Sequence, residues 1–110
     1  MRCLLRGEIV EPEVSGTVLR WLAGNTDLSM VASAFCLDPL AHAETDRGVR
    51  LVNKTGTIST ARADVGVVEG PRAAVAYAVL ANWSPDDDRR DAVLADMRAI
   101  GQAIRCHVSD

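Results

Sequence analysis

Three strand-like segments joined by short connections constrain the fold of this chain more than any other feature. They cover residues 49–57, 64–68 and 73–83. Connections of a few residues join antiparallel neighbours, whereas parallel strands need a crossover of a dozen or more residues. The sequence therefore predicts a three-stranded antiparallel sheet. The third segment is apolar almost throughout, which predicts burial on both of its faces in the middle of a sheet.

Helical patterns lie on both sides of these strands along the chain, over about 12–24, 27–37 and 85–107. The first has proline in its opening turn and ends in Gly-Asn, and the second stops before a proline. The third begins with a hydroxyl cap, a proline and carboxylates, and carries an apolar stripe suited to lie on the sheet. The predicted fold is α+β: two N-terminal helices, a three-stranded antiparallel sheet and a C-terminal helix packed on the sheet.

The first strand ends in Lys54-Thr55-Gly56, and the second begins with the R-x-D pattern of residues 62–64. A Gly-Pro turn, a long apolar strand and a C-terminal helix follow in that order. This succession resembles the last third of a class A-type serine β-lactamase, or of a related serine hydrolase with a penicillin-binding-protein-like fold. The resemblance implies that residues 1–110 form a single domain that corresponds to the C-terminal part of that fold.

The resemblance also implies a substrate-binding role for five residues along one edge of a cleft. Lys54 would be the electrostatic clamp for a substrate carboxylate, and Thr55 would donate a hydrogen bond to it. Gly56 would leave room for the ligand. The backbone N–H of Thr57 would be one oxyanion-hole donor, and Arg62 an auxiliary carboxylate-binding group. The expected ligand is a β-lactam or a peptide-like small molecule.

The nucleophile of this family lies in an S-x-x-K motif, and this motif is absent from the sequence, in which Lys54 is the only lysine. The family's S-D-N element is absent as well. No catalytic residue is therefore predicted in this chain, and a serine for acyl transfer would come from a longer version of the protein or from a separate chain. We expect the isolated chain to be inactive as a hydrolase.

Composition narrows the remaining function classes. A net charge of -3 and a pI of about 5.3 argue against nucleic-acid binding. Cys3, Cys36 and Cys106 are not spaced with His42 and His107 as zinc ligands, so neither a metal nor another cofactor is predicted. We find no signal peptide and no apolar segment long enough to span a membrane, so no membrane association is predicted. Members of the family are usually exported, and the localisation of this chain is left open.

Two alternatives to a hydrolase portion stay open: a non-catalytic binding or oligomerising module, and a vestigial gene fragment. Lys54 would then be an exposed lysine on an edge strand. In the family fold, further strands and an N-terminal helix flank this sheet. Without them a sheet edge and an apolar face would be exposed, which predicts self-association or pairing with a missing N-terminal half.

Overall fold

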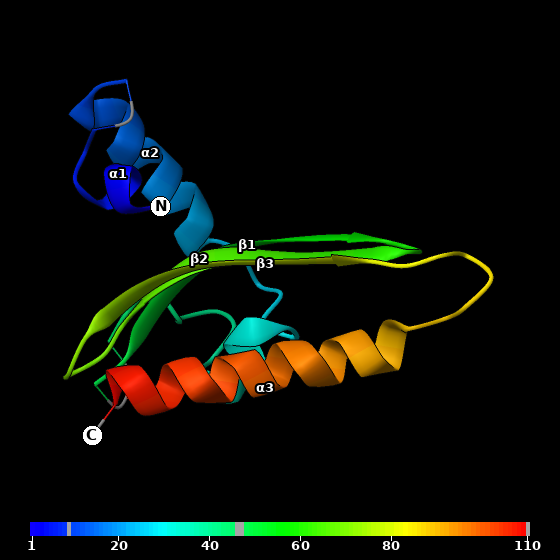
Figure 1. The fold of residues 1–110 in the computed structure, drawn as a ribbon. Coiled ribbons are helices and arrows are strands. Elements are labelled where there is room, and N and C mark those ends of the chain that lie inside the picture. Colours follow the sequence, from blue (N-terminus) through cyan, green and yellow to red (C-terminus); the bar gives the residue numbers. More distant parts are fainter. Residues whose placement is uncertain (9, 46–47, 110) are drawn as a thin grey trace.

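The computed structural model describes residues 1–8, 10–45 and 48–109, apart from the side chains of Cys3 and Leu5. Residues 46 and 47, which precede the first predicted strand, lie outside this part. The elements follow the order helix, helix, short 3-10 helix, three strands and a long helix (Figure 1). They are α1 (Arg2–Leu5), α2 (Pro12–Ala23), η1 (Val31–Phe35), β1 (Arg50–Ile58), β2 (Ala61–Glu69), β3 (Ala74–Asn82) and α3 (Arg90–Val108).

The three strands form an antiparallel sheet in the order β1-β2-β3, as the short connections predict. Thr55 pairs with Asp64 across β1 and β2, and Val65 pairs with Ala78 across β2 and β3. Figure 1 shows α3 and η1 on one side of the sheet, with α1 and α2 on the other side near one end. The predicted α+β class and the C-terminal helix packed on the sheet are confirmed.

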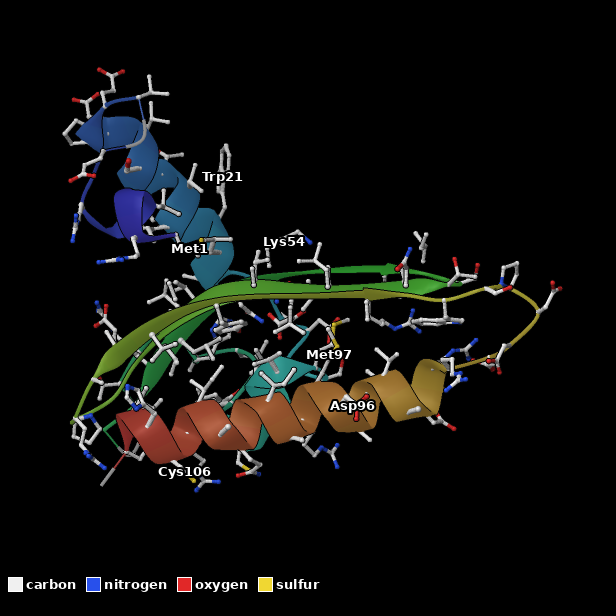
Figure 2. The ribbon with its side chains drawn as sticks, in the orientation of Figure 1. Met1, Trp21, Lys54, Asp96, Met97 and Cys106 are labelled. Atoms are coloured by element: carbon white, nitrogen blue, oxygen red, sulfur yellow. The ribbon has the colours of Figure 1, made fainter. Side chains whose placement is uncertain are left out.

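The core lies between the sheet and the layer that α3 and η1 form. Leu51 from β1 and Val68 from β2 are fully buried in one cluster with Met97 of α3. Figure 2 shows Met97 on the side of α3 that faces the sheet. Val31 and Phe35 bring η1 into the same cluster. Full burial of side chains of this size contributes about 1.5–3 kcal/mol each, so this layer is the main source of stability.

The helix predicted over 27–37 is present only as η1, which covers five residues. Local hydrogen bonds explain the difference. The Asp27 carboxylate accepts hydrogen bonds from the backbone N–H and the hydroxyl of Ser29, and the Ser33 hydroxyl donates to the Met30 carbonyl. Such side chain–backbone bonds satisfy groups that an α-helix would otherwise pair. Cys36 then takes a left-handed conformation (φ 54°) and ends the segment.

The C-terminal helix begins at Arg90, five residues later than the predicted start at 85. Ser84 does act as a local cap, because its hydroxyl accepts a hydrogen bond from Asp86 N, but the segment closes into a turn. Asp88 accepts a second bond from Arg90 N. The polar side chains that looked like a helix start therefore stabilise a loop.

The prediction that β3 is buried on both faces is wrong for the part of the chain that the structure describes. Val75, Tyr77 and Val79 face the core. The alternate residues on the other face are exposed, with Leu80 71% exposed, and they are Ala74, Ala76, Ala78 and Leu80. The continuous apolar run thus belongs to a strand with one uncovered apolar face. Among the described residues, no helix is long and apolar enough to cross a membrane.

Gly101 should be indispensable for the contact between α3 and η1. A Cβ atom there would lie 2.2 Å from the Val31 carbonyl oxygen and 2.8 Å from the Ala34 Cβ. We expect Gly101→Ala to lower the free energy of unfolding by about 1–3 kcal/mol, because the helix must move away from η1. Urea denaturation measures this loss.

Gly16→Ala is the matched control, because a Cβ there would meet only the end of the Arg20 side chain, at 3.6 Å. It should leave stability unchanged or raise it by up to about 1 kcal/mol through helix propensity. Equal effects of the two substitutions would contradict the packing described here.

Candidate functional site

The residues that the sequence singles out lie at one end of the edge strand β1. Lys54, Gly56 and Thr57 are exposed, whereas Thr55 is only 7% exposed because its side chain points to the opposite face of the sheet from Lys54. The Lys54 ammonium donates a hydrogen bond to the Thr55 carbonyl oxygen. Figure 2 shows the Lys54 side chain on the side of the sheet opposite to α3.

The free edge of β1 presents backbone N–H groups of alternate residues. Leu51 N donates to the His42 carbonyl oxygen at 2.8 Å, so the backbone groups of Leu51 point away from β2. Strand N–H groups alternate in direction with a period of two, and the β1–β2 register runs without a bulge. The N–H groups of Thr55 and Thr57 therefore also point outward from the sheet edge.

His42 fixes the loop that precedes β1 against this edge. Its ring is fully buried, with Nδ1 2.6 Å from the Leu51 carbonyl oxygen and Nε2 in contact with the Asn25 carbonyl oxygen. The imidazole thus joins β1 to the segment that follows α2. No local pattern in the sequence indicates this role of His42, because its partners lie 9 and 17 residues away along the chain.

A buried carboxylate, that of Asp64 in β2, accepts hydrogen bonds from β1, β3 and η1. Asp64 is fully buried and accepts hydrogen bonds from Asn53 Nδ2 and the Tyr77 hydroxyl, both at 3.1 Å, and from Ala32 N at 3.2 Å. Burial raises the pKa of Asp64 although these donors oppose the shift, and burial together with the Asp64 charge raises the pKa of Tyr77. Asp64 therefore has a structural role.

Asp27, at the start of the helix predicted over 27–37, lies near Lys54 and Thr55, and the sequence did not single it out as a site residue. Burial alone would raise the pKa of its carboxyl group. Hydrogen bonds from Ser29 and Thr55, together with the Lys54 charge, outweigh burial and hold the pKa below its ordinary value. The carboxylate is therefore in its charged form at neutral pH, next to the residues that the sequence proposes for anion binding.

Arg62 is held at the end of the β1–β2 hairpin. Its guanidinium group donates to the carbonyl oxygens of Ile58 at 2.5 Å and Ala61 at 2.8 Å, and it lies 5.6 Å from the ring centre of Trp83. An open pocket of about 490 Å³ at this end of the sheet is lined by residues including Gly56, Thr57, Arg62 and Leu80. The structure thus brings Thr57 and Arg62 to one pocket, while Thr55 faces Asp27.

Among the residues that the structure describes, no group of three or more His, Cys, Asp or Glu side chains could hold a metal ion. Cys36 and Cys106 are free and exposed.

An antiparallel sheet with a K-T-G sequence on its edge strand and a C-terminal helix across one face is characteristic of serine β-lactamases and penicillin-binding proteins. A family model described as the beta-lactamase enzyme family matches residues 1–108. The chain therefore belongs to the beta-lactamase enzyme family. No functionally curated protein shows significant sequence similarity to it.

Solved structures confirm the fold. The chain is similar to the β-lactamase from Sphaerobacter thermophilus DSM 20745, with a TM-score of 0.67 and 20% identity over 96% of this chain and 36% of that protein. It is also similar to PBP-A, with a TM-score of 0.70 and 17% identity over 94% of this chain and 35% of that protein. A PBP-A variant in an acyl-enzyme complex with penicillin G matches with a TM-score of 0.67 and 19% identity, over 94% of this chain and 35% of that protein. The chain thus spans about a third of the length of these proteins and represents a partial fold.

Removal of the buried charge should change the pH dependence of stability. The raised pKa of Asp64 means that the native state binds more protons than the unfolded chain above pH 3.8, the ordinary value. The free energy of unfolding therefore falls as pH rises from about 3.8 through the raised pKa. Wild type should lose stability relative to Asp64→Asn over this range, measured by urea denaturation at each pH.

Asp96→Asn, at an exposed position on α3, serves as the control and should follow the wild-type curve. Parallel curves for wild type and Asp64→Asn would contradict a raised pKa at this site.

Proposed function

We propose that this chain supplies the K-T-G wall of a serine β-lactamase-like site for a β-lactam or a peptide-like amide. Lys54 attracts the carboxylate of the ligand, and the Thr55 hydroxyl is its hydrogen-bond donor. Gly56 lets the ligand approach the strand backbone closely. Thr57 N–H is one donor to the oxyanion, and Arg62 adds positive charge at the far end of the wall.

The observation that carries this proposal is the arrangement of groups along the free edge of β1. An exposed ammonium on Lys54, a glycine at position 56 and the outward N–H of Thr57 follow one another on a strand that pairs on one side only. Arg62 pairs with Thr57 across the sheet and lines the same pocket. A cation followed by free backbone donors suits an elongated ligand with a carboxylate and a carbonyl group.

Acyl transfer needs a nucleophile, which this chain does not provide. The sequence has no S-x-x-K and only one lysine, so no serine has a lysine partner for its activation. If a complete site is formed, the serine comes from another segment or another chain. Its oxygen attacks the amide carbonyl and forms an acyl ester as the C–N bond breaks and the amine leaves. Water then hydrolyses the ester and releases the serine. This chain alone binds such ligands without turning them over.

Ligand binding should depend on Lys54. We expect benzylpenicillin to shift the amide NMR signals of residues 54–57, and Lys54→Ala to weaken its affinity about tenfold or more, because a charge-assisted hydrogen bond contributes about 1.5–3 kcal/mol. The chain should not hydrolyse a chromogenic cephalosporin.

Arg98→Ala removes an equal charge from an exposed position on α3 and should bind benzylpenicillin as wild type does. An unchanged affinity of Lys54→Ala for benzylpenicillin would refute the role of Lys54 as the clamp. Turnover of the cephalosporin by the isolated chain would refute the statement that this chain provides no nucleophile.

The face of β3 that carries Leu80 and the exposed alanines is apolar and uncovered, and we propose that it binds a partner. Leu80 is 71% exposed beside the exposed alanines of β3, and Trp21 of α2 is also 71% exposed. Figure 2 places Trp21 on the side of the sheet opposite to α3. Among the described residues β3 is also an outer strand, so its backbone groups on the side away from β2 have no strand partner there. When the rest of a β-lactamase-like fold does not cover them, this face and this edge pair with a second copy of the chain. In a non-catalytic module, binding through the same surface would itself be the function.

Leu80→Glu should favour the monomer, because a charge in the apolar interface loses its hydration. Sedimentation equilibrium of wild type should show self-association that this substitution weakens about tenfold or more. Leu40→Glu changes a residue that is 85% exposed outside the sheet and should associate like wild type. A monomeric wild type at all concentrations would contradict the pairing proposal.

A further inference from the structure

The segment between α2 and η1 crosses the free edge of β1 and brings Asp27 to it. Figure 1 shows this segment passing from the side of the sheet that carries α2 to the side that carries η1. Asn25 Nδ2 donates to the Asp27 carbonyl oxygen and to Asn53 Oδ1, both at 3.0 Å. Asn53 Nδ2 in turn lies 3.5 Å from the Asp27 carbonyl oxygen. Asp27 is therefore tied to β1 at Asn53, two residues before Thr55.

The Asp27 carboxylate is held in one orientation on this edge. Its Oδ1 accepts hydrogen bonds from Ser29 N at 3.0 Å and from Ser29 Oγ at 2.6 Å. The side chains of Asn53 and Thr55 lie on the same face of β1. Thr55 is among the groups that lower the pKa of the Asp27 carboxyl group. Thr55 is only 7% exposed, whereas its neighbours Lys54 and Gly56 are open to solvent.

A carboxylate of the protein itself is thus held beside the face of β1 that carries the hydroxyl which the proposed function assigns to the carboxylate of a ligand. The Lys54 charge lowers the pKa of Asp27, so this cation attracts the Asp27 carboxylate as it would attract that of a ligand. Two carboxylates in one small site repel each other. An anionic ligand at Thr55 must therefore move Asp27 away or bind beside its charge, and its affinity falls.

We infer that Asp27 is a specificity-determining residue that acts as an internal competitor for carboxylate ligands at the Lys54-Thr55 wall. This inference rests on the proposed function, because it concerns ligands of the same site. Asp27 lowers the affinity for ligands with a negative group at Thr55, and it favours ligands that are neutral there. The ordered Ser29 turn and the Asn25–Asn53 link keep the carboxylate in place.

The carboxylate remains charged over the pH range in which most ligands would be tested. The hydrogen bonds from Ser29 and Thr55 and the Lys54 charge outweigh the effect of burial and keep the pKa of Asp27 below 3.8. Asp64 is the other carboxylate that acts on this cluster from within the sheet. The competition is therefore present at neutral pH and is relieved only in acid, when Asp27 takes up a proton.

The experiment is an NMR titration of wild type, Asp27→Asn and Asp38→Asn with benzylpenicillin. Asp38 is the matched control, because it makes the same kind of turn with Leu40 N at 2.9 Å, is exposed, and changes the net charge equally. We expect Asp27→Asn to bind about fivefold or more tightly than wild type, and Asp38→Asn to bind as wild type does.

Equal or weaker binding by Asp27→Asn, with measurable binding by wild type, overturns the inference and leaves the proposed function intact. If neither wild type nor Asp27→Asn binds, the proposed function falls and this inference falls with it. A measurement without ligand tests the inference even if Asp27→Asn does not fold. The carboxyl ¹³C signal of Asp27 should titrate at higher pH in Thr55→Val than in wild type, and an unchanged midpoint also overturns the inference.

Discussion

The hydrogen bonds to the buried Asp64 carboxylate hold three elements of this fold together. Asp64 lies on the central strand and receives donors from β1, β3 and η1. An unpaired buried carboxylate would cost several kcal/mol, so the donors must stay in place as long as the chain is folded. Gly66 makes room for them, because a Cβ there would lie 2.8 Å from both the Tyr77 hydroxyl and the Asn53 Cβ. The cluster therefore fixes η1 and both neighbouring strands relative to β2.

The candidate site follows from this arrangement. Asn53, which is held by Asp64, is also the residue that bonds to Asn25 and to the Asp27 carbonyl oxygen. One side chain thus links the buried cluster to the segment at the free edge of β1. Lys54 and Thr57 on that edge remain open, whereas Thr55 is covered. The fold itself therefore orders residues 54–57 of β1. Lys54 and the Asp27 carboxylate determine the charge along this part of the strand.

Much of the fold could be predicted from local patterns. The short connections predicted the antiparallel sheet, and proline with acidic residues predicted the start of α2. The K-T-G sequence indicated the similarity to serine β-lactamases and penicillin-binding proteins. Local patterns predicted the wrong helix boundaries where a polar side chain could cap either a helix or a turn. Ser84 and Asp88 cap turns of a loop and not the helix, and Asp27 closes a turn with Ser29 and not the first turn of a helix. The contacts of Asp27 and His42 with β1 join residues far apart in sequence, which no periodicity reveals. The apolar run of β3 predicted burial on both faces because hydrophobicity does not show whether a covering layer is part of the chain.

We expect the Asp64 cluster to join η1 to the sheet as one cooperative unit. Amide hydrogen exchange of the whole chain tests this directly, because Ala32 N donates to the buried Asp64 carboxylate. We predict that the Ala32 amide exchanges as slowly as the amides in the centre of β2, since both open only on global unfolding. Exchange of Ala32 at the rate of an exposed loop amide, with β2 still protected, would contradict the account.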